Sequence, residues 1–123
     1  MKPRLICAAP LPTAVAERAS AEFYAVLSQE RELAIDELLA ELERQASIEA
    51  ILISSRIKLD AHAIAGLPAQ VRIVATCSVG TDHIDLKAAR ARGLIVTNTP
   101  DVLTDATADL AFMLLLCAAR RAR

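Results

Sequence analysis

The segment Ser78-Val79-Gly80-Thr81-Asp82, called the 78–82 loop below, has the residue types of a binding site for a small anion. It follows the apolar run 71–75, and a loop that leaves the carboxyl end of a strand is where open α/β sheets bind their ligands. Gly80 lets two successive backbone N–H groups turn toward an anion without a Cβ in the way. We therefore predict that this loop binds a carboxylate.

The glycines of the chain exclude a second kind of site. There are three, Gly66, Gly80 and Gly93, and their spacing forms neither a Gly-x-Gly-x-x-Gly turn nor a Walker-type phosphate loop. These residues therefore cannot wrap the pyrophosphate of a dinucleotide.

His83 adjoins the loop and is a residue type that exchanges protons near neutral pH. It lies on the approach to Asp85, where a capping or packing residue is expected, so we predict packing rather than catalysis. His62 is expected at the surface. Asp82 and Asp85 have no partner at metal-ligand spacing, and we predict no metal site.

The cysteine pattern indicates a reducing compartment. The chain has three cysteines, an odd number, which lie far apart and form no Cys-x-x-Cys pair: Cys7, Cys77 and Cys117. We predict three buried thiols in the cytosol. The apolar start at 5–9 is interrupted by Pro10 and Pro12, short of the roughly 7–15 apolar residues of a secretory signal. A cytoplasmic location is therefore expected.

Length and composition fit one domain. The chain has 123 residues, of which 54% are apolar and 2% aromatic, so its core must consist of Leu, Ile, Val and Ala. The formal net charge is −1 and the charges are interspersed, which gives no support to a nucleic-acid or membrane partner. A small metabolite is the partner that this composition leaves open.

Apolar runs of strand length alternate with helical patterns. The expected strands are residues 5–9, 23–27, 50–53, 71–75 and 94–97. Helices are expected at 12–22, from Asp36, between Asp60 and Gly66, and between Asp85 and Gly93, with each Asp as N-cap and each Gly following the last turn. The alternation implies right-handed crossovers. We therefore predict an α/β fold, a flavodoxin-like doubly wound parallel sheet of about five strands.

The final segment differs from the rest of the chain. Thr104 or Asp105 is expected to cap a helix whose residues 110–119 are apolar on every side. Ten residues are too few to span a bilayer, so we predict burial against a second domain or a second copy of the chain. The predicted division is a flavodoxin-like domain at 1–103 and an interdomain helix at 104–123.

Three motifs in order resemble the D-isomer-specific 2-hydroxyacid dehydrogenase family. They are residues 77–85 (CSVGTDHID), residues 93–109 (GLIVTNTPDVLTDATAD), and the Leu-rich helix that ends in Arg120-Arg121. Within the family, residues 99–105 look most like the glyoxylate/hydroxypyruvate reductase branch. The resemblance is dense from about Ile51 onward and topological before it.

The resemblance implies the N-terminal part of an enzyme that reduces a 2-oxo acid, or oxidises a 2-hydroxy acid, with NAD or NADP. In the family the backbone N–H groups of this Val-Gly pair bind the substrate carboxylate, which assigns that role to Val79 and Gly80, and the adjoining Ser78 is a further candidate substrate-binding residue. Thr104 matches a position that touches the cofactor. Ser54 and Ser55 are candidate substrate neighbours, or else strand-end residues that bond to backbone. A homodimer through 104–123 is also expected.

No catalytic residue is assigned to this chain. The family's catalytic arginine, glutamate and histidine, and its glycine fingerprint, lie in a Rossmann domain that would follow Arg123. The chain alone is therefore expected to be inactive. The alternative is a stand-alone module of flavodoxin-like fold that binds a small acid or a protein without catalysis.

Overall fold

The computed structural model describes residues 1–122, which form one five-stranded sheet with all paired strands parallel. The strands are β1 (Arg4–Cys7), β2 (Tyr24–Leu27), β3 (Ala50–Ile53), β4 (Ile73–Thr76) and β5 (Ile95–Thr97). Their order, β2-β1-β3-β4-β5, is the order of flavodoxin-like sheets. The predicted fold class is confirmed, and each strand ends within two residues of its expected limits.

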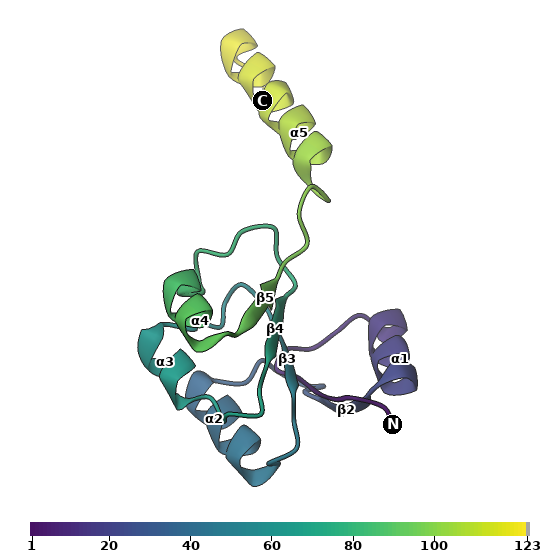
Figure 1. Cartoon of the computed structure of the whole chain (residues 1–123). Helices are drawn as coiled ribbons and strands as arrows, with labels where there is room; N and C mark the ends of the chain where they lie inside the picture. The colour runs from purple at the N-terminus through teal and green to yellow at the C-terminus, as the bar shows by residue number, and fades with distance from the viewer. Residues whose placement is uncertain (123) are drawn as a thin grey trace.

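The helices are distributed unequally over the two faces of the sheet. They are α1 (Thr13–Glu22), α2 (Ile35–Arg44), α3 (Ala61–Gly66), α4 (Leu86–Arg92) and α5 (Thr104–Arg120). Figure 1 shows α2, α3 and α4 on one face of the sheet and α1 alone on the other. This distribution follows from right-handed crossovers, because the chain moves from β1 to β2 in one direction and from β2 through β5 in the other.

The main core lies under α2, α3 and α4. Ile6, Ile51 and Val74 are paired across neighbouring strands, and all three are fully buried. Helices contribute further buried side chains to the same cluster: Leu38, Leu42, Ala63, Ile64 and Ala89. Full burial of one Leu or Ile side chain adds about 1.5–3 kcal/mol to the free energy of unfolding, so this face contributes most of the stability of the domain.

The α1 face is less complete. Its core consists of Leu5, Cys7 and Ala19, with partly buried residues around them. A groove of about 410 Å³ lies beside α1, and most of its lining is apolar: Leu5, Val15, Ala19, Phe23, Ala50, Leu52, Ile73 and Ala75. Parallel sheets are normally covered on both faces, so this groove is exposed sheet surface of the kind that another element usually covers.

Two helices begin and end as the sequence predicts, apart from one glycine. The Asp60 carboxylate accepts a hydrogen bond from the Ala63 N–H (2.8 Å), and Asp85 accepts one from Ala88 (2.9 Å). Gly93 ends α4 with φ of 75°, a left-handed conformation that favours glycine. Gly66 was expected just after α3, but it is the last helical residue there, and Leu67 follows as the C-cap.

Helix α2 begins earlier than predicted. Asp36 was expected to be the N-cap, but Ala34 occupies that position and Asp36 lies in the first turn. Ala34 has no side-chain acceptor, so the start is held from inside the helix, where the Glu37 carboxylate accepts the Ala34 N–H (2.8 Å). Arg31 also binds this carboxylate, and these contacts lower the pKa of Glu37 to about 2.

Helix α5 projects away from the sheet (Figure 1). It begins at Thr104 with Leu103 as N-cap, so the prediction of a Thr104 or Asp105 cap is wrong. No residue of α5 in the described part of the chain is buried, and six large apolar side chains are 50–64% exposed: Leu110, Phe112, Met113, Leu114, Leu115 and Leu116. Burial of this helix against another domain or copy stays a prediction.

Candidate functional site

The carboxyl ends of the parallel strands meet at one edge of the sheet, and the 78–82 loop lies there. It follows β4, and the Cys77 N–H donates to the carbonyl oxygen of Ile53 (2.9 Å), so the loop starts beside the end of β3. The strand order changes direction between β1 and β3, which is where doubly wound sheets place their ligand crevice. The 78–82 loop is one strand from that point.

Four hydrogen bonds engage the carbonyl oxygens of the loop, one of them from the Ile84 N–H to the Thr81 carbonyl (2.9 Å). The Thr99 N–H donates to the Ser78 carbonyl (2.9 Å), and the Asn98 side-chain amide donates to the Val79 carbonyl (2.7 Å). The Ser78 hydroxyl donates to the Gly80 carbonyl (2.8 Å). The loop is therefore held by its own Ser78 side chain, by Ile84 and by the first two residues after β5.

The N–H groups of the same loop have no such partners. Within residues 1–122, no hydrogen bond takes the backbone N–H of Val79 or of Gly80, and both residues are exposed. Two neighbouring donors without a partner in the described structure, with the adjacent carbonyl oxygens bound elsewhere, are candidate hydrogen-bond donors to an anion. This arrangement fits a carboxylate, which accepts hydrogen bonds through two oxygens.

The backbone conformation at position 80 does not itself require glycine. Gly80 is not among the residues with positive φ. A Cβ at Gly80 would meet only the Asp82 carboxylate oxygen, at an ordinary 3.5 Å. Glycine at this position therefore leaves open space beside Asp82 and does not relieve backbone strain.

Below the loop lies a buried hydroxyl that the sequence analysis did not single out. Thr76, the last residue of β4, is 2% exposed. Its Oγ1 lies 2.8 Å from the Ser78 hydroxyl and 2.8 Å from His83 Nε2. His83 thus packs against the base of the loop through a hydrogen bond. The sequence signal that could have identified Thr76 is a polar residue at the end of an otherwise apolar strand.

Ser54 and Ser55 follow β3 in a turn at the same edge. The Ser54 hydroxyl bonds to the Glu32 carboxylate and accepts the Arg56 backbone N–H (3.1 Å). These bonds are those of a strand-end turn, the alternative role considered for Ser54. Ser55 is exposed in the turn. Neither serine is hydrogen-bonded to the 78–82 loop in the described structure, and a substrate contact for them stays a prediction.

Thr104 lies at the start of α5, beyond the connector formed by residues 98–103. The connector contacts the loop through Asn98 and Thr99, and it turns at Asp101, whose φ is 63°. Thr104 is exposed, and no hydrogen bond joins it to the loop within residues 1–122. Its cofactor contact stays a prediction.

The cysteines differ from their predicted environment. Cys7 is buried, and burial raises the pKa of its thiol to about 11, so the thiol is protonated near neutral pH. Cys77 is exposed and Cys117 is half-buried, so the prediction of three buried thiols is wrong. Cys77 lies just past the end of β4, beyond the row of buried strand residues.

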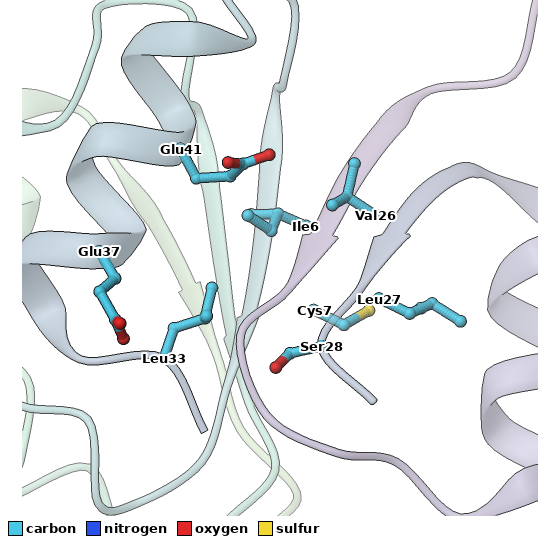
Figure 2. Close-up of a pocket in the computed structure, with 8 residues that line it drawn as sticks. All are labelled: Ile6, Cys7, Val26, Leu27, Ser28, Leu33, Glu37 and Glu41. Atoms are coloured by element: carbon cyan, nitrogen blue, oxygen red, sulfur yellow. The ribbon is translucent and has the colours of Figure 1, made fainter. Parts of the chain in front are cut away.

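A second cavity, of about 210 Å³, lies between α2 and the ends of β1 and β2 (Figure 2). Apolar side chains form much of its wall, including Ile6, Val26 and Leu33, with Glu37 and Glu41 on α2. Both carboxylates are paired with arginines, Glu37 with Arg31 and Glu41 with Arg44. The cavity therefore offers no unpaired charge to a ligand, and the 78–82 loop is the stronger candidate.

The described residues lack two features that would indicate other types of site. Within residues 1–122, no three His, Cys, Asp or Glu side chains come together as a metal ion would require, and His62 is exposed as predicted. Among the same residues, no helix has the length and apolar character needed to cross a membrane.

Residues 5–118 match the family of D-isomer specific 2-hydroxyacid dehydrogenases, over its catalytic domain. The chain is 39% identical over 123 residues to a glycerate dehydrogenase of Hyphomicrobium methylovorum, covering 98% of this chain and 37% of that protein. It is 40% identical over 121 residues to a glyoxylate reductase of Pyrococcus horikoshii, covering 98% of this chain and 35% of that protein.

Solved structures agree with these sequence matches. One is an NADPH-dependent glyoxylate/hydroxypyruvate reductase of Sinorhizobium meliloti in complex with NADP and malonate. It superposes with a TM-score of 0.73 at 32% identity, over 95% of this chain and 34% of that one. The chain thus spans little more than a third of the length of these relatives.

Proposed function

Because the chain belongs to the D-isomer specific 2-hydroxyacid dehydrogenase family, we propose that it forms the substrate-binding lobe of a reductase for small 2-oxo acids. The relatives named as glyoxylate reductase and as glyoxylate/hydroxypyruvate reductase favour that branch. The substrate would be a two- or three-carbon oxo acid, and the reverse reaction would oxidise the corresponding 2-hydroxy acid.

The observation that carries the proposal is the pair of free N–H groups at Val79 and Gly80. They are exposed, they lie at the carboxyl edge of the sheet, and the loop's carbonyl oxygens are held by other donors. A carboxylate bound there would fix one end of the substrate and leave its carbonyl carbon to the reacting groups. Fixing the substrate in this way lowers the entropic part of the barrier.

The cofactor would be NAD or NADP, held mainly by residues outside this chain. The three glycines of the chain form no dinucleotide fingerprint, so the residues present do not fit a pyrophosphate. Thr104 remains a proposed contact at the edge of the cofactor. We assign no catalytic residue to this chain and propose that residues 1–123 alone do not turn over substrate.

The proposed domain division places residues 1–103 in the substrate lobe and gives 104–123 a connecting role. Each of the six exposed large side chains of α5 would gain about 1 kcal/mol on losing its remaining exposure. A Rossmann domain or the same helix of a partner would supply the covering surface, and we propose a homodimer through this helix. A returning segment of a longer chain would cover the apolar groove beside α1.

The alternative is a non-catalytic module that binds a small acid or a protein. It shares the 78–82 loop with the main proposal and differs in needing no cofactor. We propose a cytoplasmic location for either form, on the grounds of three cysteines that form no disulfide.

The test is to express the uninterrupted reading frame that carries this chain and to assay the purified product. Glyoxylate and hydroxypyruvate would each be offered with NADH and with NADPH, beside residues 1–123 alone as the control. We expect oxidation of a reduced cofactor by the longer protein and none by the control. A reading frame that ends at Arg123, or a longer product that reduces neither acid, would favour the binding module.

A further inference from the structure

We infer that Thr76 and His83 are positioning residues for the 78–82 loop, joined to it by a hydrogen-bond chain whose direction is fixed. The inference rests on the proposed carboxylate site and adds two residues to it. The chain runs from His83 Nε2 to Thr76 Oγ1 (2.8 Å), then to Ser78 Oγ (2.8 Å), then to the carbonyl oxygen of Gly80 (2.8 Å).

Counting hydrogens fixes the direction. A carbonyl oxygen can only accept, so the single hydroxyl hydrogen of Ser78 must be donated to Gly80. Ser78 then has no hydrogen left for Thr76, so Thr76 must donate to Ser78. Thr76 likewise has no hydrogen left for His83, so His83 Nε2 must carry the hydrogen that it donates to Thr76.

The direction assigns a tautomer. In neutral imidazole one nitrogen carries the hydrogen and the other accepts. His83 is therefore in the Nε2–H form, with Nδ1 as its acceptor nitrogen. Its backbone is also fixed, since its carbonyl accepts the Leu59 N–H (2.8 Å) and Leu59 forms a bridge with Ile84.

The hydrogen bonds from His83 to Gly80 also explain why the loop would present N–H groups, and not carbonyl oxygens, to a bound carboxylate. Ser78 holds the Gly80 carbonyl, and Asn98 holds the Val79 carbonyl. If either oxygen turned outward, it would bring a negative dipole end toward the bound carboxylate. The Ser78 hydroxyl donates its only hydrogen within the loop. We therefore assign Ser78 a role in holding the loop's geometry rather than in donating to the substrate.

Thr76 is the link that holds the two ends together. It is 2% exposed, so water cannot readily replace either of its partners. Thr76→Val keeps the shape of the side chain and removes both bonds, whereas Thr76→Ser keeps the hydroxyl. Comparing the two variants separates the hydrogen-bond chain from packing.

The first experiment reads the tautomer directly. Long-range proton–nitrogen NMR spectra of the intact 123-residue chain at pH 8 would assign the two ring nitrogens of His83. We expect a protonated Nε2 and an unprotonated Nδ1. A protonated Nδ1 with a bare Nε2 would overturn the inference, because Thr76 could then no longer donate to Ser78.

The second experiment measures the affinity for oxamate, a stable mimic of a 2-oxo acid, from amide shifts of the same chain. We expect about a tenfold weaker affinity for Thr76→Val, as the loss of a buried hydrogen bond implies, and a change within about twofold for Thr76→Ser. Equal binding by a folded Thr76→Val chain would overturn the positioning role. If that variant does not fold, Ser78→Ala is used instead. It interrupts the same series of hydrogen bonds at a partly exposed residue and must show the loss of affinity.

The two arms separate this inference from the proposed function. If wild type binds no oxamate, the carboxylate site fails, while the His83 tautomer still tests the direction of the chain. If wild type binds oxamate and His83 is in the Nδ1–H form, only the further inference fails.

Discussion

The 78–82 loop and helix α5 show opposite relations to the rest of the chain. The loop is held by residues of the same chain, since Thr99, Asn98 and Ser78 bind its carbonyl oxygens. Helix α5 has no buried residue in the described structure and exposes a row of large apolar side chains. The loop is thus supported within the described chain, whereas α5 is not, and we propose that another protein surface covers this helix.

The largest expected effect concerns α5 and self-association. Leu110 and Leu114 are four residues apart on one side of the helix and are 52% and 56% exposed. The double variant Leu110→Glu/Leu114→Glu should turn a self-associating chain into a monomer, as measured by sedimentation velocity. Thr107→Glu is the control, because it adds charge to α5 without removing a large apolar side chain.

This first prediction also tests the comparison. Oxamate binding should be the same in the double variant and in wild type, because α5 makes no bond to the loop within residues 1–122. A wild-type chain that sediments as a monodisperse monomer, with α5 still helical, would contradict the expected role of this helix.

The next effect concerns the space in front of Gly80. Gly80→Val in the complete enzyme should raise KM for the oxo acid by about tenfold or more, because the side chain enters the proposed carboxylate site. The backbone tolerates a Cβ there, so the fold should survive. Cofactor affinity should change little, and Lys87→Val on exposed α4 surface is the control. An unchanged KM would show that the 78–82 loop does not bind the substrate carboxylate.

Asn98 offers a smaller and more specific perturbation. Asn98→Leu removes the donor to the Val79 carbonyl (2.7 Å) and leaves the loop backbone otherwise intact. A loss of about one hydrogen bond predicts roughly a fivefold weaker affinity for oxamate. Titration of the variant beside Thr97→Val, an exposed neighbour at the end of β5, would measure it. Equal affinity would mean that the loop does not need this bond.

The smallest effect concerns acid stability at the start of α2. Arg31 and the Ala34 N–H lower the pKa of Glu37 from 4.5 to about 2. A lowered carboxyl pKa stabilises the fold above pH 4.5, and this contribution is lost as the pH falls from 4.5 toward 2. Urea unfolding over that range should show a smaller pH dependence for Glu37→Gln than for wild type.

Most of the fold was predictable because it rests on local patterns. Apolar runs gave the strands, and Asp60 and Asp85 marked two helix starts with their side chains. Where a helix start depends on other contacts, the prediction failed. Ala34 and Leu103 are N-caps without a capping side chain, and nothing in their residue type marks them.

The position of the 78–82 loop after a strand of the sheet was predictable, but the hydrogen bonds that support it were not. The small residues after a strand pointed to Val79 and Gly80. The bonds from Asn98 to Val79 and from His83 to Thr76 join residues 19 and 7 positions apart, so no local pattern predicts them. The geometry of the Asn98 bond follows from the parallel pairing of β4 with β5, which brings the start of the connector beside the loop.

The most direct measurement of the central claim is an amide titration of the isotope-labelled chain with oxamate and, separately, with oxamide. Oxamate carries a carboxylate at the position where oxamide carries a neutral amide. The account predicts saturable shifts of the Val79 and Gly80 amide signals with oxamate and none with oxamide. Saturable shifts elsewhere with these two signals unmoved, or equal responses to both compounds, would contradict a carboxylate site at the 78–82 loop.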